Sequence, residues 1–291
     1  MKVLVLGGSG LLGHKLVQIF KSRFETCSTL HGQSDKYQGL DIFDGVKIIE
    51  NFEAESTELA TKVITDVEPD VIVNAIGITK HVPANDDLIR TLTINSIFPH
   101  RLAKIAADIN SRLICISTDC VFSGEKGNYD ETDAADAMDL YGKSKSLGEV
   151  VEGNCLTIRT SIVGRELFTR NSLVEWFLNN RGGRVKGFTK AIFTGFPTIV
   201  LAEIIADIIE KHSNLRGLYH VSSDKISKFD LLQLINDAMN VGVEIEADNE
   251  LAINRSLDSR RFRNATGFVT KNWPEMIKLM ADDARIYETI G

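Results

Sequence analysis

A strand, a glycine turn and a helix follow one another without a break at the start of this chain. Residues 1–13 read Met-Lys-Val-Leu-Val-Leu-Gly-Gly-Ser-Gly-Leu-Leu-Gly, which spaces Gly7, Gly10 and Gly13 as G-x-x-G-x-x-G. Glycine lets the backbone turn sharply, approach a pyrophosphate closely and pack the new helix against its strand. A glycine-rich turn alone is weak evidence, but its place after a predicted strand makes a dinucleotide the expected ligand.

Predicted strands and helices alternate through the first half of the chain. Apolar, strand-like runs cover residues 3–6, 24–29, 71–75, 113–117 and 156–162, and amphipathic helical patterns cover residues 11–20, 59–67, 88–109 and 144–152. This order predicts an α/β Rossmann fold, a doubly wound parallel sheet with helices on both faces. Ligands of such sheets bind at the carboxyl ends of the strands, where residues 7–13, 74–79 and 117–124 fall.

The alternation weakens after about residue 160. We therefore expect residues 1–160 to form an NAD(P)-binding Rossmann domain, and residues 161–291 to form mainly a smaller C-terminal α/β lobe that binds substrate. Glycines and Pro197 interrupt the pattern before a predicted helix at residues 200–210 and a strand at residues 217–222. The chain is expected to return to the first domain over residues 195–222.

Composition narrows the classes of function. The 291 residues have a formal net charge of -7, which argues against nucleic acid or an anionic membrane as the partner. No charged leader is seen, and no apolar run approaches the roughly 18 residues of a membrane span, so we expect a cytoplasmic protein. The four cysteines lack a C-x-x-C pair and no compact metal-ligand spacing occurs, so we expect reduced thiols and no metal. Small-molecule chemistry is favoured.

One tyrosine has a lysine four residues later. In Tyr141-Gly-Lys-Ser-Lys145 the phenol and the ammonium would share a helix face. A phenol with a pKa of about 10 is a poor proton shuttle at neutral pH unless positive charge stabilises its phenolate. Thr118 follows a predicted buried strand, where its hydroxyl could bond a substrate carbonyl. The alternative is a solvated helix face and an ordinary polar turn.

These segments together resemble the extended short-chain dehydrogenase/reductase family, and most closely its dTDP-4-dehydrorhamnose reductase branch. The resemblance rests on the glycine loop, Asn74-Ala75, the Ser117-Thr-Asp-Cys-Val-Phe-Ser-Gly124 segment and Tyr141-Gly-Lys-Ser-Lys145. Later segments resemble the same branch, so the similarity covers most of the chain: Arg159-Thr160-Ser161, Gly195-Phe-Pro-Thr198, Gly217-Leu-Tyr-His220, and Leu257-Asp258 followed by Arg261-Phe262.

The resemblance implies a reductase that passes hydride from NAD(P)H to a keto carbon of a nucleotide-linked deoxysugar, with C4 as the favoured position. Such sugars are precursors of cell-surface polysaccharide. Tyr141 would donate the proton, Thr118 would orient the carbonyl, and Lys145 would lower the phenol's pKa and bind ribose. Asn95, in a helix interrupted near Pro99, would support a proton-relay water.

The resemblance also implies two sets of binding residues. The cofactor would contact Gly7, Ser9, Gly10, Leu11, Leu12, Gly13, His31, Asp41, Ile42, Asn74, Ala75, Ile76, Asn95, Tyr141 and Lys145. The nucleotide sugar would contact Thr79, Cys120, Val121, Phe122, Arg159, Asn171 and Arg261, with Arg159 and Asn171 at the diphosphate. The cluster of Arg260, Arg261 and Arg263 would meet phosphates or form a solvated basic turn.

The end of the second strand bears on the choice of cofactor. An acid there usually binds the adenosine 2′-hydroxyl of NAD, but this chain reads Thr29-Leu-His-Gly-Gln33 with no acid before Asp35. A 2′-phosphate contacted by His31 or Lys36 would fit, so we expect NADP, with NAD as the alternative. Asp41-Ile42 resembles the family's adenine-contacting pair.

Departures from the branch leave other functions open. Cys120 replaces a tyrosine, and it would either pack or move a proton, as a cysteine does in the related GDP-fucose synthases, which epimerise and reduce. Arg255 and Arg261 are also unusual. Dehydratases need Asp-Glu after the threonine, and Asp119-Cys120 counts against that reaction. The regulatory subunit of methionine adenosyltransferase has similar motifs without catalysis, although Thr118, Tyr141 and Lys145 favour an enzyme. The sugar, the nucleotide and the oligomeric state stay open, with a homodimer as one option.

Overall fold

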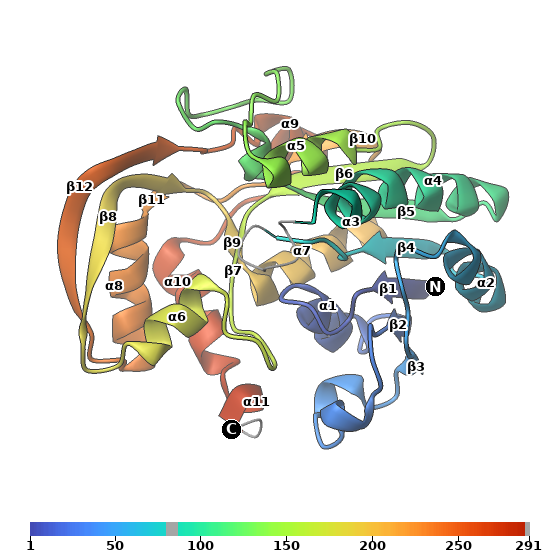
Figure 1. The fold of residues 1–291 in the computed structure, drawn as a ribbon, viewed down its shortest axis with the longest axis horizontal. Coiled ribbons are helices and arrows are strands. Elements are labelled where there is room, and N and C mark those ends of the chain that lie inside the picture. Colours follow the sequence, from blue (N-terminus) through green and yellow to red (C-terminus); the bar gives the residue numbers. More distant parts are fainter. Residues whose placement is uncertain (80–86, 289–291) are drawn as a thin grey trace.

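A sheet of seven parallel strands forms the centre of the computed structural model, which describes residues 1–79 and 87–288. The strand order is β10-β6-β5-β4-β1-β2-β3 (Figure 1). The strands are β1 (Lys2–Leu6), β2 (Glu25–Thr29), β3 (Lys47–Ile49), β4 (Val71–Asn74), β5 (Arg112–Thr118), β6 (Cys155–Thr160) and β10 (Gly217–His220). The Rossmann prediction is confirmed, and β10 returns the late chain to the sheet.

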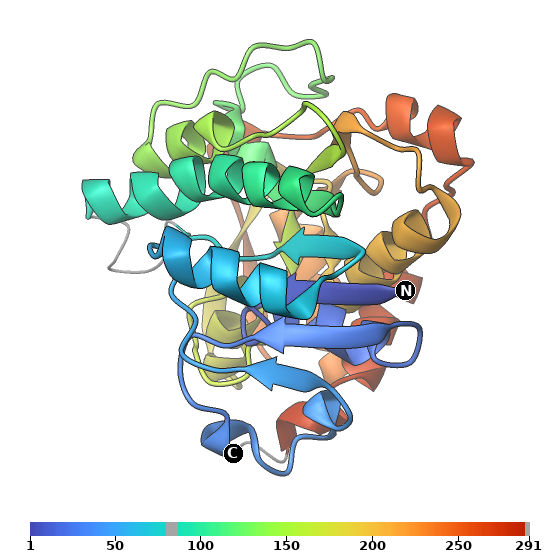
Figure 2. The same cartoon turned by 90° about the vertical axis from the view of Figure 1, so that its right-hand side faces the viewer.

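The direction of winding reverses between β1 and β4. From β1 the chain adds β2 and β3 on one side, and then β4, β5 and β6 on the other. Figure 2 shows β4, β1, β2 and β3 stacked in this order with their arrows aligned. Ligands of doubly wound sheets bind at such a switch point, outside the carboxyl ends of the strands. The phosphate loop after β1 and the turn after β4 border this position.

Alternate residues of the strands enter two different cores. Val3 and Val5 face α1 (Gly13–Phe20) and α7 (Thr198–Lys211), whereas Leu4 and Leu6 face α2 (Thr57–Val67) and α4 (Phe98–Asp108). A buried parallel sheet needs apolar side chains on both faces, which explains the continuous apolar run in β1. Both helix layers thereby fix the ends of the strands where the candidate site lies.

The helix predicted over residues 88–109 is present with a local irregularity. It consists of α3 (Leu88–Leu92), the π-helical segment η4 (Thr93–Ile97) and α4. A π-helical turn widens the helix by one residue and is frequent at functional sites. Asn95 lies in this turn and is 1% exposed.

The next helix, α5 (Leu140–Leu147), begins earlier and ends earlier than the predicted residues 144–152. Asp139 caps its start by accepting a 2.8 Å hydrogen bond from Gly142 N. Gly148 ends it where the chain passes close to η4, because a Cβ there would lie 1.9 Å from the Asn95 carbonyl oxygen. Tyr141 and Lys145 therefore lie on one helix, one turn apart.

A smaller mixed sheet forms the C-terminal lobe. β8 (Arg184–Phe193) pairs with β12 (Glu244–Asn254) in parallel and with β11 (Ile226–Ser227) in antiparallel orientation. The strands β7 (Ile162–Val163) and β9 (Phe196–Pro197) form a separate pair. The lobe's remaining helices are α6 (Leu173–Asn179), α8 (Lys228–Met239), α9 (Arg260–Thr266), α10 (Trp273–Asp282) and α11 (Arg285–Glu288). A smaller α/β lobe is confirmed, and the boundary at residue 160 stays a prediction.

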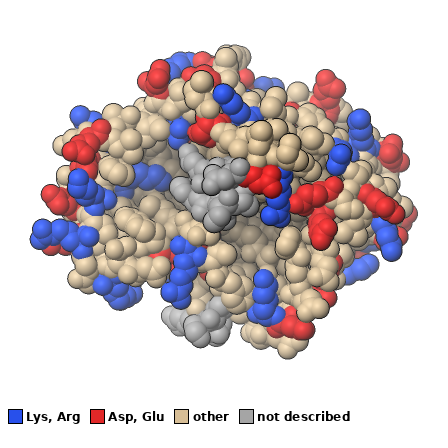
Figure 3. Space-filling view, viewed as in Figure 1, with Lys and Arg blue, Asp and Glu red and all other residues tan. Residues whose placement is uncertain are grey.

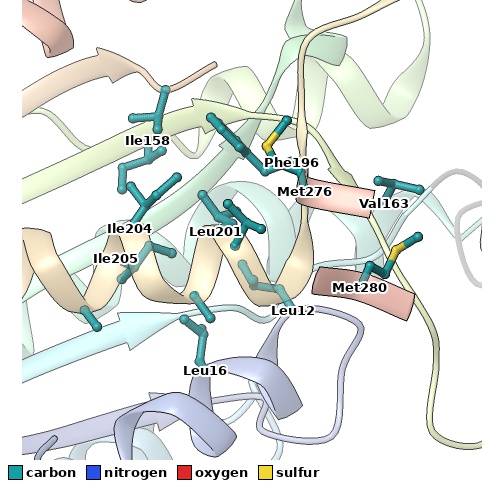
Figure 4. Close-up of a cluster of buried hydrophobic side chains, with 14 of the residues drawn as sticks. Leu12, Leu16, Ile158, Val163, Phe196, Leu201, Ile204, Ile205, Met276 and Met280 are labelled. Atoms are coloured by element: carbon teal, nitrogen blue, oxygen red, sulfur yellow. The ribbon is translucent and has the colours of Figure 1, made fainter. Parts of the chain in front are cut away.

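One buried cluster joins the two lobes. Leu16 of α1, Ile158 of β6 and Leu201 of α7 share it with Met276 and Met280 of α10 (Figure 4). Burial of this size ties the late helices to the Rossmann sheet. On the face in Figure 3, basic and acidic side chains are interspersed. Each helix in the described part of the chain is too short or too polar to cross a membrane.

Candidate active site

The predicted phosphate loop joins β1 to α1. Gly7 has a φ of +86°, a backbone conformation that residues other than glycine rarely adopt. At Gly13 a Cβ would lie 1.9 Å from the Gly7 carbonyl oxygen, so only glycine lets the helix pack this close to the strand. A Cβ at Gly8, a position that we did not predict, would lie 1.9 Å from Ser28 Oγ, so it would displace a side chain, whereas the clash at Gly13 is with backbone.

Backbone N–H groups of the loop are available to an anion. Within residues 1–79 and 87–288, no hydrogen bond is formed by the N–H groups of Ser9, Leu11 and Leu12, while Gly10 N donates to Gly7 O at 3.0 Å. These free donors lie at the positive N-terminal end of α1, where a pyrophosphate is stabilised. The glycine packing and the free donors fit the dinucleotide that the sequence predicts.

The segment after β2 reaches the other end of this site. His31 and Lys36 are exposed, and the Lys36 ammonium lies 4.9 Å from the Tyr37 ring centre. Asp41 is exposed, but Ile42 is 1% exposed and packs with Leu167 and Tyr287. Of the expected adenine-contacting pair, only the Asp41 side chain faces solvent.

The turn after β4 is shaped by two asparagines. Asn74 Oδ1 accepts from Ile76 N at 3.1 Å, directly after Ala75. Asn95 Oδ1 accepts from Ile78 N at 2.9 Å, and its Nδ2 donates to Ile78 O at 2.9 Å and to Ser144 Oγ at 3.1 Å. These bonds engage the whole amide of Asn95, so its side chain positions the turn and α5. Thr79, at the end of this turn, is exposed.

Thr118, Tyr141 and Lys145 meet at the carboxyl end of β5. The Thr118 hydroxyl accepts from Cys120 N at 3.1 Å, donates to Asp119 Oδ1 at 3.3 Å and lies close enough to the Tyr141 phenol to act on its pKa. Lys145 Nζ donates to Ile116 O at 2.8 Å and lies beside Gly77, so its ammonium is between the ends of β5 and β4. The spacing of four residues on α5 thus brings Tyr141 to the Thr118-Cys120 turn and Lys145 to the ends of β5 and β4, and their catalytic roles stay a prediction.

Burial dominates the electrostatics of this group. It raises the pKa of Tyr141, with a further rise from Cys120, while the Thr118 hydroxyl opposes the shift. Lys145, which we expected to lower this pKa, is not among the groups that act most on it. Tyr141 is thus a protonated phenol at neutral pH, able to donate. Burial also lowers the pKa of Lys145, an effect opposed by Cys115 and Glu149.

Three of the predicted substrate contacts are interior residues. Val121 and Phe122 are 0% exposed, and Phe122 stacks on Tyr129 with a centroid distance of 4.1 Å. Arg159 is 5% exposed, and its Nε and Nη2 bond both carboxylate oxygens of Glu149 at 2.8 and 2.7 Å. These side chains therefore pack beneath the site in this structure, and their contact with a nucleotide sugar stays a prediction.

The other predicted basic contacts are dispersed. Arg261 stacks on Tyr219 of β10 at 4.6 Å, and β6 separates β10 from β5. Arg260 pairs with Asp258, and Arg263 pairs with Asp224 at 3.6 Å. This arrangement is that of a solvated basic turn. Asn171 is exposed in the loop before α6.

Two cations of the C-terminal lobe lie next to the Asp119-Cys120 turn. Arg255 Nε donates to Phe122 O at 2.7 Å, and its Nη1 lies 3.9 Å from Cys120 Sγ. Lys228 acts electrostatically on Asp119 and Cys120. The half-buried Cys120 therefore lies between Tyr141 and the second lobe.

Lys228 is a candidate site residue that we did not predict. Its ammonium is 4.0 Å from the Phe193 ring centre, and burial lowers its pKa to about 8. No carboxylate of the described residues lies within ion-pair distance of it. A lysine in the first turn of a helix opposes the helix dipole, so this placement does not favour stability. Lys228 reaches the Asp119-Cys120 turn only through the tertiary fold, so no local sequence pattern indicates this proximity.

Comparisons with known proteins agree with this geometry. The family model for the RmlD substrate binding domain matches residues 1–286. A dTDP-4-dehydrorhamnose reductase of Aggregatibacter actinomycetemcomitans is 26% identical over 95% of this chain and 97% of its own. The methionine adenosyltransferase 2 subunit beta of Mus musculus is 26% identical over 82% of this chain and 72% of its own.

A solved structure shows the same fold. The crystal structure of dTDP-4-dehydrorhamnose reductase from Bacillus anthracis in complex with NADP superposes with a TM-score of 0.78 at 21% identity, covering 98% of this chain and 99% of that one. Together with the family match over nearly the whole chain, these findings assign the protein to the RmlD substrate binding domain family, whose reductases are extended short-chain dehydrogenases/reductases.

Proposed function

We propose that this protein reduces a keto group of a nucleotide-linked deoxysugar, with C4 as the favoured position, and that NADPH is the reductant. The observation that supports this most is the meeting of Thr118, Tyr141 and Lys145 at the end of β5, beside the switch point that the phosphate loop borders. A proton donor, a carbonyl-orienting hydroxyl and a cation are what reduction of a ketone requires from the protein.

The bound nicotinamide would supply the hydride. Thr118 would donate a hydrogen bond to the substrate carbonyl oxygen, and Tyr141 would transfer its phenolic proton to that oxygen as the carbon gains hydride. The C=O group thereby becomes CH–OH. The phenolate left on Tyr141 would be stabilised by the positive charge of Lys145, one turn later on the same helix.

The choice of NADP over NAD rests on the segment after β2. His31 and Lys36 are exposed there, and residues 30–34 contain no acid. A free basic side chain suits a 2′-phosphate, whereas an acid would repel it. On the substrate side, Arg255 and Lys228 give positive charge complementary to an anionic nucleotide sugar. A cytoplasmic location and a homodimer remain our predictions.

A panel of 4-keto-6-deoxy nucleotide sugars mixed with NADPH tests the proposal. Wild type should consume NADPH with at least one member, and the product should be the corresponding alcohol. NADPH binding without turnover of any member would instead favour a regulatory role, as the similarity to the methionine adenosyltransferase subunit allows. The combination of Thr118, Tyr141 and Lys145 favours the enzyme.

Epimerisation is a second candidate because Cys120 lies next to Tyr141. The Cys120 thiolate could accept a proton from the carbon next to the carbonyl, and after exchange with solvent the thiol could return a proton to that carbon. In deuterium oxide, wild type would then incorporate deuterium at that carbon, and the Cys120→Ser variant would not. Absence of deuterium in the wild-type product would eliminate this candidate and leave reduction intact.

A further inference from the structure

The end of the described chain packs against the first turns of α1, next to the phosphate loop. Lys15 is 1% exposed, and its Nζ lies 2.5 Å from Asp283 Oδ2. Gln18 joins this pair, since its Oε1 accepts from Lys15 at 2.7 Å and its Nε2 donates to Asp283 at 2.6 Å. Leu12 of the loop also lies in the buried cluster of Met280 (Figure 4). The C-terminal segment, residues 283–287, is thus docked on the loop's own helix.

A hydrogen-bond chain runs from this segment into the loop. Tyr287 OH lies 2.7 Å from His14 Nε2, and His14 Nδ1 lies 2.8 Å from Gly10 O. A carbonyl oxygen can only accept, so Nδ1 has the hydrogen. Burial lowers the pKa of His14 to about 3, so the ring is neutral and Nε2 accepts the Tyr287 hydroxyl hydrogen. Each hydrogen bond from Tyr287 through His14 to Gly10 therefore has a fixed donor and acceptor.

These hydrogen bonds end at the Gly10–Leu11 peptide unit, which faces the expected pyrophosphate site. Gly10 O also accepts from His14 N at 3.1 Å, so two bonds from one residue orient this carbonyl. The Gly10–Leu11 peptide is planar and trans, so its N–H points opposite to its C=O. Leu11 N–H therefore projects beyond the start of α1, where no described group accepts it. Orienting Gly10 O orients a donor for an anion.

We propose that Tyr287 and His14 are positioning residues that hold Leu11 N–H toward the dinucleotide pyrophosphate, so that docking of the C-terminal segment and dinucleotide binding strengthen each other. The inference rests on the proposed function only in that the loop binds a dinucleotide. Because coupling between two binding events is reciprocal, the dinucleotide must stabilise the docked segment by the same factor by which the segment improves affinity.

The Tyr287→Phe variant tests the first half. It removes the hydroxyl but keeps the ring that lies 4.7 Å from Lys15 Nζ and 4.7 Å from the Arg165 guanidinium. We expect NADPH, titrated by calorimetry without any sugar, to bind about three- to tenfold more weakly, the effect of one neutral hydrogen bond. The matched control is Tyr219→Phe, which removes a hydroxyl on β10, and its dissociation constant should equal that of wild type.

A variant pair tests whether the two residues act in one chain. His14→Phe should weaken NADPH binding at least as much as Tyr287→Phe, and the double variant should bind no more weakly than His14→Phe alone. If the losses of NADPH affinity in the two single variants add up in the double variant, His14 and Tyr287 do not act through one series of hydrogen bonds. A purely structural role would lower the melting temperature of Tyr287→Phe without changing its dissociation constant, and that result would overturn the proposal.

Hydrogen exchange tests whether NADPH stabilises the docked C-terminal segment. It uses wild-type protein, so the result does not depend on the folding of a variant. NADPH should slow amide exchange over residues 283–288 as well as over residues 9–13. Slowing of residues 9–13 alone would overturn the proposal. The proposed function can fail on its own. If NADPH binding and docking of the C-terminal segment are coupled but no sugar is reduced, the reductase proposal is wrong and the present inference is unaffected.

Discussion

Asn95 in the π-helical turn donates a 3.1 Å hydrogen bond to Ser144 Oγ of α5. The same amide bonds both the N–H and the carbonyl of Ile78, so one buried side chain joins three elements around the site. Ser96 Oγ adds a 2.8 Å bond to Ser144 O. The helix that presents Tyr141 and Lys145 is thereby fixed to the turn that follows β4.

Replacement of this amide should destabilise the fold. Asn95→Ala leaves the buried N–H and carbonyl of Ile78 without partners, and we expect a loss of about 2–3 kcal/mol in the free energy of unfolding by urea. Ser144→Ala removes only one partner of Asn95 and should lose about 1 kcal/mol. Equal losses in the two variants would contradict the role given to the Ile78 bonds.

Two glycines of the phosphate loop should respond differently to alanine. A Cβ at Gly13 would be 1.9 Å from Gly7 O, whereas one at Gly10 would meet the same atom at 3.3 Å. Gly13→Ala should therefore cost several kcal/mol of stability, on the scale of overpacking a core. Gly10→Ala should change stability by about 1 kcal/mol or less and act mainly on NADPH affinity. Thermal unfolding and titration separate the two effects, and similar melting temperatures would refute the packing argument.

Loss of the Tyr141 hydroxyl should abolish most turnover. Because burial keeps its pKa raised, Tyr141 is the protonated donor at neutral pH, and Tyr141→Phe should lower kcat by about 10²–10⁴-fold. Its NADPH dissociation constant should stay within about threefold of wild type. An unchanged kcat would show that another group donates the proton.

Lys228 should reduce stability while helping function. Its pKa is lowered from the usual 10.5 to about 8, so the unfolded chain keeps this proton at pH values where the fold has released it. The group therefore opposes folding fully below about pH 8, and the penalty disappears as pH rises toward 10.5.

Lys228→Met should therefore be more stable than wild type by about 1–2 kcal/mol at pH 7, a figure reduced for partial exposure. The difference should shrink in urea titrations at higher pH. The same variant should raise KM for the nucleotide sugar, since it removes a cation from the substrate side. A variant that is less stable at neutral pH would contradict the sign, and an unchanged KM would remove Lys228 from the site.

The cofactor half could be predicted because its signals are local. Glycine spacing, the apolar runs of β1 and β4, and the four-residue step from Tyr141 to Lys145 each depend on a few neighbouring residues. The start of α5 was misplaced because Asp139, its cap, lies outside the apolar pattern. Parallel strands bring separate local signals to one edge, so the site followed from the fold.

The C-terminal lobe gave weaker signals for physical reasons. β12 is mostly exposed, so it lacks the apolar alternation that identifies a half-buried strand. The pairs Arg159 with Glu149 and His14 with Tyr287 depend on tertiary contact, and the sequence alone could not distinguish a buried arginine from a ligand-binding one. Lys228 was missed for the same reason.

Transfer of an isotope from the cofactor tests the reductase most directly. NADPH with deuterium at the transferable position of its nicotinamide should be mixed with wild-type protein and the panel of 4-keto-6-deoxy nucleotide sugars. We predict that deuterium appears on the former carbonyl carbon of at least one sugar, and that Tyr141→Phe slows this transfer as it slows kcat. Tight NADPH binding with no deuterium on any sugar would contradict the account and indicate a binding subunit.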